Sequence, residues 1–268
     1  MEEGGRKVSL AGVALVLGMW LYAVLLLLPL RAWARLRRRR PALRSGGLGI
    51  RFSPQVDGPR PAAVRHAPAE FDDIAPDYDR CVGPFAGPIF ASALDAIAPY
   101  LARGSRVLDV GCGPGAALSS VARLVADGEV VGVDVSLPML KLAHERARRE
   151  RVANVALFQA DAAELASSFA DSFDVAYSCL VHHHLSDPTA AVRGIAATLR
   201  PGGVYAAIDA TGPRLTALAT PLARAVDPGW VRFWAREALM RLLADAGLER
   251  IGWIPLAPGI GIAIGTRA

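Results

Sequence analysis

The chain has 268 residues, of which 53% are hydrophobic and 21% are charged. This composition excludes a largely disordered chain and suits one α/β domain with an appendage. The net charge of +5 is unevenly placed, because residues 1–60 hold eleven of the 30 Lys and Arg but three of the 25 Asp and Glu. The remainder carries a net charge of −3, so we expect no nucleic-acid partner, which would require a basic surface.

The N-terminal segment from Val8 to Leu30 contains no charged residue over 23 positions. A helix of that length can cross a hydrocarbon layer of about 30 Å. Seven arginines between Arg31 and Arg44 follow it, whereas Arg6 and Lys7 precede it. Because positive residues stay on the cytoplasmic side, we expect residues 1–34 to form a single-pass membrane anchor with the remaining chain in the cytoplasm.

A cleaved secretory signal is the alternative interpretation of this segment. Ala32-Trp33-Ala34 has the small-residue spacing of a cleavage site. The apolar run is longer than in a typical signal, however, and arginines crowd the cleavage region, which favours an anchor. Residues 35–68 are rich in Arg, Pro and Gly without a sustained period, which predicts a linker.

Residues 69–268 alternate strand-like and helix-like segments, which is typical of a parallel sheet covered by helices. The predicted strands are residues 106–110, 129–135, 155–159, 174–179, 203–209, 250–255 and 261–266. The predicted helices are residues 89–101, 117–126, 139–149, 189–199 and 236–246. The last two strands are too close in sequence for a parallel crossover. The pattern therefore predicts an α/β, Rossmann-like fold with a seven-stranded, mostly parallel sheet that ends in an antiparallel hairpin.

A glycine loop follows the first predicted strand, in the pattern Asp109-x-Gly111-x-Gly113-x-Gly115. A strand, a glycine loop and a helix commonly bring backbone close to a ligand. The spacing differs from the G-x-G-x-x-G of nicotinamide-binding proteins. A carboxylate here disfavours a pyrophosphate and favours a cationic ligand. A purely structural turn, with Asp109 capping a neighbour, stays open as an alternative.

Two further aspartates follow the next predicted strands. Asp134 ends residues 129–135, where a carboxylate can accept both hydroxyl hydrogens of a ribose. Asp161, followed by Ala162, comes after the next strand, where it can accept from an adenine amino group. A helix N-cap is an equally good interpretation of Asp161. Together the two carboxylates predict a nucleoside site.

The run Val107–Gly115, followed by Asp134, Asp161, Asp174 and Leu199–Gly203, closely resembles the ordered motifs of class I S-adenosylmethionine-dependent methyltransferases. The resemblance covers about residues 70–268 and implies S-adenosyl-L-methionine as cofactor. It implies that Gly111 and Gly113, with Gly115 in the same loop, pass close to the methionine moiety.

The resemblance also implies roles outside the glycine loop. Val135 and Met139 would pack on the adenine, although helix core is an alternative role for Met139. The Cys179 backbone would lie near the cofactor amine, and the side chain is equally suited to a small buried position. Residues 70–79 resemble the entry segment of ubiquinone and menaquinone C-methyltransferases, which implies that Tyr78 covers the carboxylate end of the cofactor.

Three consecutive histidines, His182, His183 and His184, follow the strand of residues 174–179. Consecutive side chains do not easily converge on one ion, and the three cysteines form no C-x-x-C pair, so we predict no metal site. A histidine at this sheet edge can act as a general base. We select His183 and His184 as candidate catalytic residues, with a structural hydrogen bond as the alternative.

These features predict methyl transfer from S-adenosylmethionine to a small, lipophilic acceptor, such as a quinone precursor or a lipid, at a membrane. Two other classes stay open. A nicotinamide-dependent oxidoreductase is disfavoured by the glycine spacing and by the closing hairpin. A catalytically silent, membrane-tethered cofactor-binding protein is compatible with the same residues.

Overall fold

The computed structural model describes the part of the chain that contains the sheet and its helices. The described residues are 50–52, 71–72, 74–81, 83–212, 229–257 and 259–268. Within them no helix combines the length and the apolar character needed to cross a bilayer. The predicted anchor of residues 1–34 lies outside the described residues.

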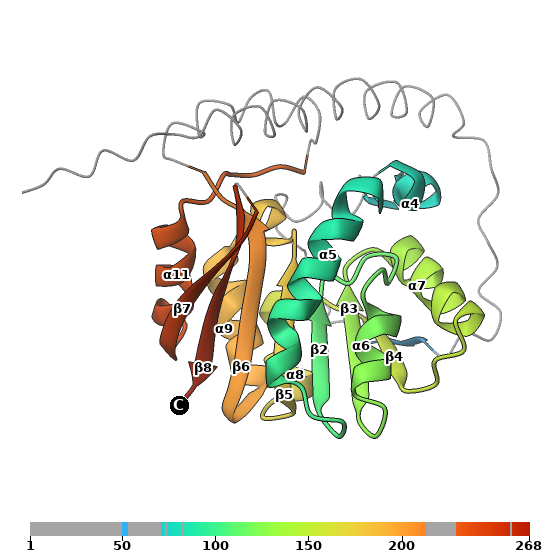
Figure 1. The fold of residues 1–268 in the computed structure, drawn as a ribbon, viewed down its shortest axis with the longest axis horizontal. Helices are drawn as coiled ribbons and strands as arrows, with labels where there is room; N and C mark the ends of the chain where they lie inside the picture. The colour runs from blue at the N-terminus through green and yellow to red at the C-terminus, as the bar shows by residue number, and fades with distance from the viewer. Residues whose placement is uncertain (1–49, 53–70, 73, 82, 213–228, 258) are drawn as a thin grey trace, which may run out of the picture.

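A mixed sheet forms the centre of the molecule, with the strand order β1-β4-β3-β2-β5-β6-β8-β7 (Figure 1). The strands are β1 Ile50–Phe52, β2 Arg106–Val110, β3 Glu129–Asp134, β4 Val155–Gln159, β5 Phe173–Cys179, β6 Leu199–Ala210, β7 Leu248–Ala257 and β8 Ile260–Arg267. Strands β1 to β6 pair in parallel, and β8 lies antiparallel between β6 and β7. The predicted parallel sheet with a closing antiparallel hairpin is confirmed.

Strand β1 adds an eighth strand to the seven that the sequence predicts. It lies inside the segment of residues 35–68 that we expected to be a linker, and it pairs with β4 through Arg51 and Phe158. Three residues are too few to show an alternating pattern in the sequence. This short strand covers the edge of β4. An uncovered strand edge can pair with other chains, so β1 protects β4 from such association.

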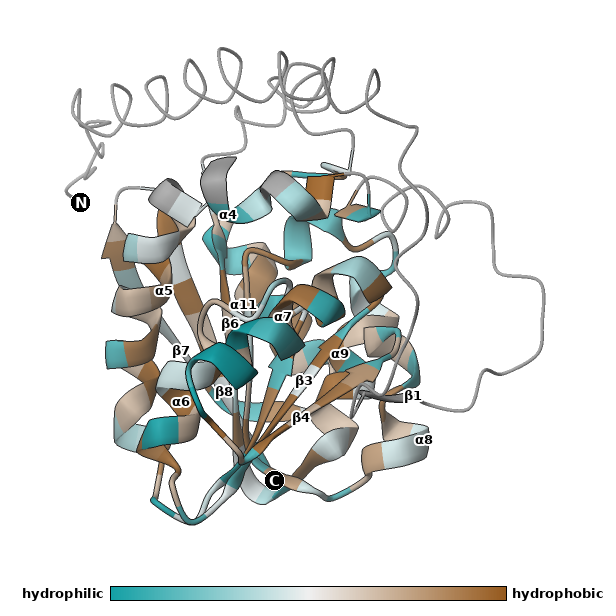
Figure 2. Ribbon diagram, turned by 90° about the vertical axis from the view of Figure 1, so that its right-hand side faces the viewer, coloured by the Kyte–Doolittle hydropathy of each residue, from teal (hydrophilic) through white to brown (hydrophobic). Residues whose placement is uncertain are grey.

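Helices cover both faces of the sheet and create two hydrophobic cores. The helices are α4 Tyr78–Cys81, α5 Gly83–Ile97, α6 Leu118–Leu124, α7 Leu137–Arg149, α8 Ala166–Phe169, α9 Pro188–Thr198 and α11 Arg236–Asp245, with short 3-10 turns η3 Ala75–Asp77, η4 Ala98–Tyr100, η5 Ala162–Glu164 and η6 His182–His184. Helices α5, α6 and α7 lie on one face, and α8, α9 and α11 lie on the other (Figure 1). Hydrophobic residues concentrate in the strands between these layers (Figure 2).

Successive side chains of β2 enter opposite cores, as strand geometry requires. Leu108 and Val110 belong to the core beneath α9 and α11, and Val107 belongs to the core beneath α5 and α6. Asp109 follows the same alternation and points toward the α5 and α6 side. This orientation decides what its carboxylate contacts.

The strand order reverses next to β2, because the chain runs outward through β3 and β4 and then returns to β5 on the other side. Loops that leave β2 and β5 therefore diverge at the carboxyl edge of the sheet. In open α/β sheets this switch point is where ligands bind. The predicted glycine loop and the three histidines both lie at this edge.

Candidate active site

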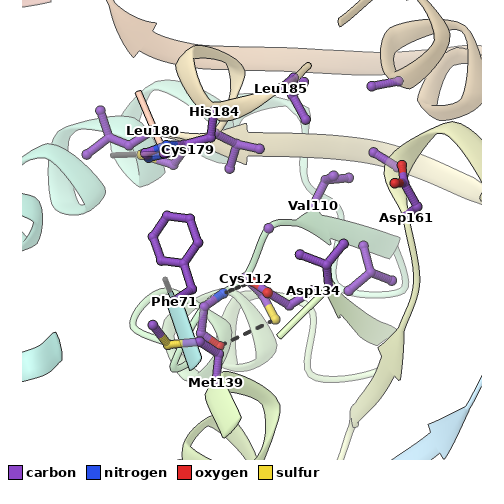
Figure 3. A pocket seen from close by; sticks show the side chains of 18 of the residues that line it. Phe71, Val110, Cys112, Asp134, Met139, Asp161, Cys179, Leu180, His184 and Leu185 are labelled. Carbon is purple, nitrogen blue, oxygen red and sulfur yellow. Dashed lines mark hydrogen bonds between the residues drawn. The ribbon is translucent and has the colours of Figure 1, made fainter. Parts of the chain in front are cut away.

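A cavity of about 360 Å³ opens at the carboxyl edge of the sheet (Figure 3). Ten of the predicted site residues line it: Tyr78, Gly111, Gly113, Asp134, Val135, Met139, Asp161, Ala162, Cys179 and His184. Three others, Asp109, Gly115 and His183, are not among its lining residues. The loops after β2, β3, β4 and β5 thus form one site, as the strand order requires.

The glycine loop is bound to β3 through its own amides. The N–H groups of Gly111 and Cys112 both donate to the Val133 carbonyl, at 2.8 and 3.0 Å. Gly111 has a φ of +68°, and a Cβ there would approach the Val181 side chain to 2.5 Å, so glycine is required by conformation and by space. The loop is consequently a tight, closed turn.

No N–H group from residue 111 to residue 115 is left for a phosphate. The Gly113 amide donates to Asp134 Oδ2 at 2.8 Å, and the Gly115 amide donates to the Cys112 carbonyl at 3.0 Å. Residue 114 is proline, which has no N–H. Pyrophosphate sites in other proteins rely on such amides, and here they are already bonded within the protein.

Charged side chains on the described cavity wall are all acidic. They belong to Asp134, Asp161 and Asp187, and no Lys or Arg appears among the described lining residues. A wall of this sign attracts a cation and repels a pyrophosphate. The loop amides and the wall charge therefore favour an uncharged or positively charged nucleoside.

Asp134 is the central carboxylate of the cavity. Its Oδ1 accepts from the Ser136 amide at 2.9 Å, and its Oδ2 accepts from Gly113. Burial raises the pKa of Asp134 to about 6, the two amide bonds oppose that rise, and the nearby Asp72 carboxylate adds to it. Each oxygen has accepted one hydrogen bond and keeps capacity for a ligand hydroxyl.

Two predicted residues have the structural role that the sequence left open, and both also line the cavity. Asp161 Oδ1 accepts from the Ala163 amide at 2.9 Å as the N-cap of η5, and the side chain also lines the cavity. Met139 is 1% exposed within the core and lines the cavity as well. The structural role of each residue thus fixes it at the cavity surface.

Asp109 differs from the expectation that its carboxylate faces a bound cation. It is 4% exposed and accepts a hydrogen bond from the Tyr177 hydroxyl at 2.7 Å. The cause is strand alternation, which turns Asp109 toward the core that contains Tyr177, its neighbour in the β2–β5 register. Burial raises the pKa of Asp109 to about 7, Tyr177 lowers it, and Asp134 raises it.

Gly115 also lies away from the cavity. It has a φ of +76°, and a Cβ would approach the Cβ of Ala143 on α7 to 3.0 Å. The residue thus permits close packing of the loop against that helix. Its absence from the cavity wall is consistent with the third glycine of such loops serving helix packing.

The three histidines occupy one 3-10 turn, η6. His182 is fully buried, with Nε2 at 2.7 Å from the Tyr205 hydroxyl and 3.1 Å from Ser178 Oγ. Burial lowers the pKa of His182 to about 4, so it is neutral at physiological pH. The environment of His182 thus differs from that of His183 and His184, whose ring centroids lie 4.0 Å apart.

His183 and His184 differ in their access to the cavity. His183 Nδ1 lies 2.6 Å from Asp209 Oδ1, its amide donates to Asp209 Oδ2 at 3.0 Å, and its ring stacks on Trp230 at 4.1 Å. His184 lines the cavity, and its ring lies edge-on to Phe71 at 4.9 Å. Of the two candidate bases, His184 is the one at the cavity surface.

Sequence reasoning missed Asp209, Phe71 and Trp230. Burial alone would raise the pKa of Asp209, but pairing with His183 and further hydrogen bonds lower it overall. Asp209 lies near the end of the predicted strand of residues 203–209, which reaches the same sheet edge, so its position was a usable signal. The contacts of Phe71 and Trp230 are long-range and leave no local pattern.

The chain is similar to known proteins in sequence and in fold. Residues 107–203 match a family model described as a methyltransferase domain. The ubiquinone biosynthesis O-methyltransferase of Neisseria meningitidis is 34% identical over 155 residues, which cover 55% of this chain and 65% of that protein. The corresponding Acinetobacter baylyi protein is matched over 41% of its length. The chain therefore spans less than two thirds of these relatives.

Two solved structures share the fold. A SAM-dependent methyltransferase from Aquifex aeolicus is 19% identical with a TM-score of 0.56, covering 75% of this chain and 98% of that one. A geranyl diphosphate C-methyltransferase from Streptomyces coelicolor, solved with S-adenosyl-L-homocysteine, is 15% identical with a TM-score of 0.57. The match covers 66% of this chain and 76% of that chain.

The raised pKa of Asp109 predicts a pH-dependent stability. Because the folded-state value of about 7 exceeds the usual 3.8, its contribution is fully present below pH 3.8 and is lost as pH rises through 7. Asp109→Asn lacks this loss, so its free energy of unfolding relative to the wild type should increase by about 1.4 kcal/mol per pH unit between pH 5 and 7. Urea unfolding at several pH values measures this, and a constant difference would contradict the assignment.

Proposed function

We propose that this chain, which carries a class I S-adenosylmethionine-dependent methyltransferase domain, methylates a small lipophilic acceptor. The cofactor of the domain is S-adenosyl-L-methionine, which when bound supplies a methyl group on a positively charged sulfur. The substrate and the activity of the whole chain are our proposal.

One observation carries the proposal, namely that the glycine loop has no free amide while the described wall carries only acidic charge. A sulfonium nucleoside has no phosphate to satisfy and is attracted by carboxylates. A nicotinamide dinucleotide would place its pyrophosphate against bonded amides and Asp134. This contrast disfavours the oxidoreductase alternative.

Different residues of the cavity would bind different parts of the cofactor. Asp134 would accept hydrogen bonds from the ribose hydroxyls, and Asp161 would accept from the adenine amino group. Val135 and Met139 offer apolar surface for the adenine ring. Tyr78 would cover the opposite, methionine end of the cofactor.

The acceptor would bind where the cavity wall is apolar and aromatic. Leu180, Leu185 and Val231 line this part together with His184. Apolar side chains of this kind suit a lipophilic molecule. His184 is placed to accept the proton of an acceptor hydroxyl at its imidazole, which makes the oxygen a better nucleophile.

Titration calorimetry tests the cofactor assignment. We expect the full chain to bind S-adenosylhomocysteine and not NADH, and Asp134→Ala to weaken binding at least tenfold. Asp245→Ala is the matched control, because it removes an exposed carboxylate at the end of α11. With a pKa of about 6 for Asp134, affinity should fall about tenfold from pH 7.5 to pH 5. Preferential binding of NADH would overturn the proposal.

Replacing His184 tests the proposed base. His184→Ala should slow transfer of labelled methyl into a membrane lipid extract roughly 10²- to 10⁴-fold, while affinity for S-adenosylhomocysteine stays within threefold. His144→Ala on α7, outside the cavity wall, is the control. An unchanged rate would exclude His184 as base, and no labelled lipid with the wild type would favour the catalytically silent alternative.

We also propose that residues 8–30 anchor the chain in a membrane, with the domain on the cytoplasmic side. The uncharged run and the arginines that follow it support this proposal. The full chain should stay in the membrane pellet after alkaline carbonate extraction. Its domain should resist external protease until the cells are lysed. Recovery of the full chain in the supernatant would contradict the anchor.

A further inference from the structure

The entry segment, residues 71–72 and 74–81, brings two aromatic side chains to the cofactor cavity. Phe71 lies at one end of the segment, and Tyr78 begins α4. Both line the cavity, so the position of this segment determines how completely a bound cofactor is covered. What fixes the segment in place is therefore relevant to cofactor binding.

Two polar contacts attach the entry segment to a single helix, α7. Ser136, the N-cap of α7, donates from its hydroxyl to Asp72 Oδ1 at 2.6 Å. In the last turn of the same helix, Arg146 Nη2 donates to Asp79 Oδ2 in an ion pair. Ten residues of helix separate the two anchor points by about 15 Å. Two contacts placed this far apart restrain the segment at both ends.

Packing beneath the segment is incomplete, which increases the importance of these contacts. A second cavity of about 420 Å³ lies between the segment, α5, α6 and α7, and it shares Tyr78, Phe90 and Ala116 with the first. Arg146 lines it with a side chain that is 17% exposed, whereas Asp79 is 56% exposed. Tyr78, Asp79 and Arg146 all line this second cavity, so the ion pair lies on the same wall as Tyr78.

We propose that Arg146 and Ser136 are positioning residues that, through Asp79 and Asp72, hold Tyr78 and Phe71 over the bound cofactor. The inference rests on the proposed function, because it concerns the same cofactor site. The Arg146 guanidinium fixes the α4 end, and the Ser136 hydroxyl fixes the other end. Neither residue has to touch the cofactor, since each acts through the segment that it holds.

A charge-reversal cycle on the full chain tests the ion pair. Arg146→Asp and Asp79→Arg should each weaken S-adenosylhomocysteine binding about five- to twentyfold in calorimetry at low salt. The double variant restores an opposite-charge pair and should bind within threefold of the wild type. Because such pairs are screened by ions, 0.5 M salt should reduce the single-variant effects. A pair needed only for folding would lower the urea midpoint of the single variants and leave the affinity of their folded protein unchanged.

Arg148→Asp is the matched control, since it makes the same charge change in the same helical turn at an exposed position. It should bind within twofold of the wild type. Asp72→Ala should weaken binding two- to fivefold and so tests the second contact. Single variants that bind like the wild type, or a double variant no tighter than the singles, would overturn the inference. A wild type that binds no S-adenosylhomocysteine would overturn the proposed function itself.

Discussion

The attachment of the glycine loop to β3 is the constraint on which the site depends. Two loop amides share the Val133 carbonyl, and a third is bonded to the Asp134 carboxylate. This arrangement makes the turn rigid and uses the donors that an anionic ligand would need. It also fixes Asp134, whose remaining lone pairs face the cavity. The ligand preference of this domain thus depends on hydrogen bonds that the loop amides already make within the protein, as well as on side chains that contact the ligand.

Three carboxylates, on β2, β3 and β6, show how the environment gives one residue type different properties. Asp109 has a phenol as its partner, and burial raises its pKa to about 7. Asp134 is bonded by two amides and has a pKa of about 6. Asp209 is paired with His183, and its pKa is lowered. Charge at neutral pH is therefore concentrated at the cavity and behind the histidine turn.

Most of the fold was predictable because its strands are short apolar runs separated by regular helices. The strand of residues 106–110 and its successors were placed within a few residues of β2 to β6. The closing hairpin followed from the length of its connection. Strand β1 was not predictable, since its three residues pair with β4 across more than a hundred positions of sequence. Pairing of that kind depends on tertiary contacts rather than local pattern.

The site was predictable where a residue's place in the chain determines its place at the sheet edge, as for Asp134 and Asp161. It was not predictable where side-chain direction decides, as for Asp109, or where distant aromatic residues meet, as for Phe71 and His184. The glycine loop and the aspartates after the strands showed which residues lie near the site. Strand alternation and packing then selected those that reach its surface.

The position of a histidine within the η6 turn determines whether its imidazole reaches the cavity. Because three identical residues divide one turn between a buried hydroxyl pair, a carboxylate and the cavity, substitution at any one of them is not equivalent to substitution at its neighbours. An insertion or deletion of a single residue ahead of the turn would move two of the imidazoles to a neighbour's location and leave the third location without a histidine. Homologous chains that keep a histidine here can therefore differ in chemistry while looking alike in composition.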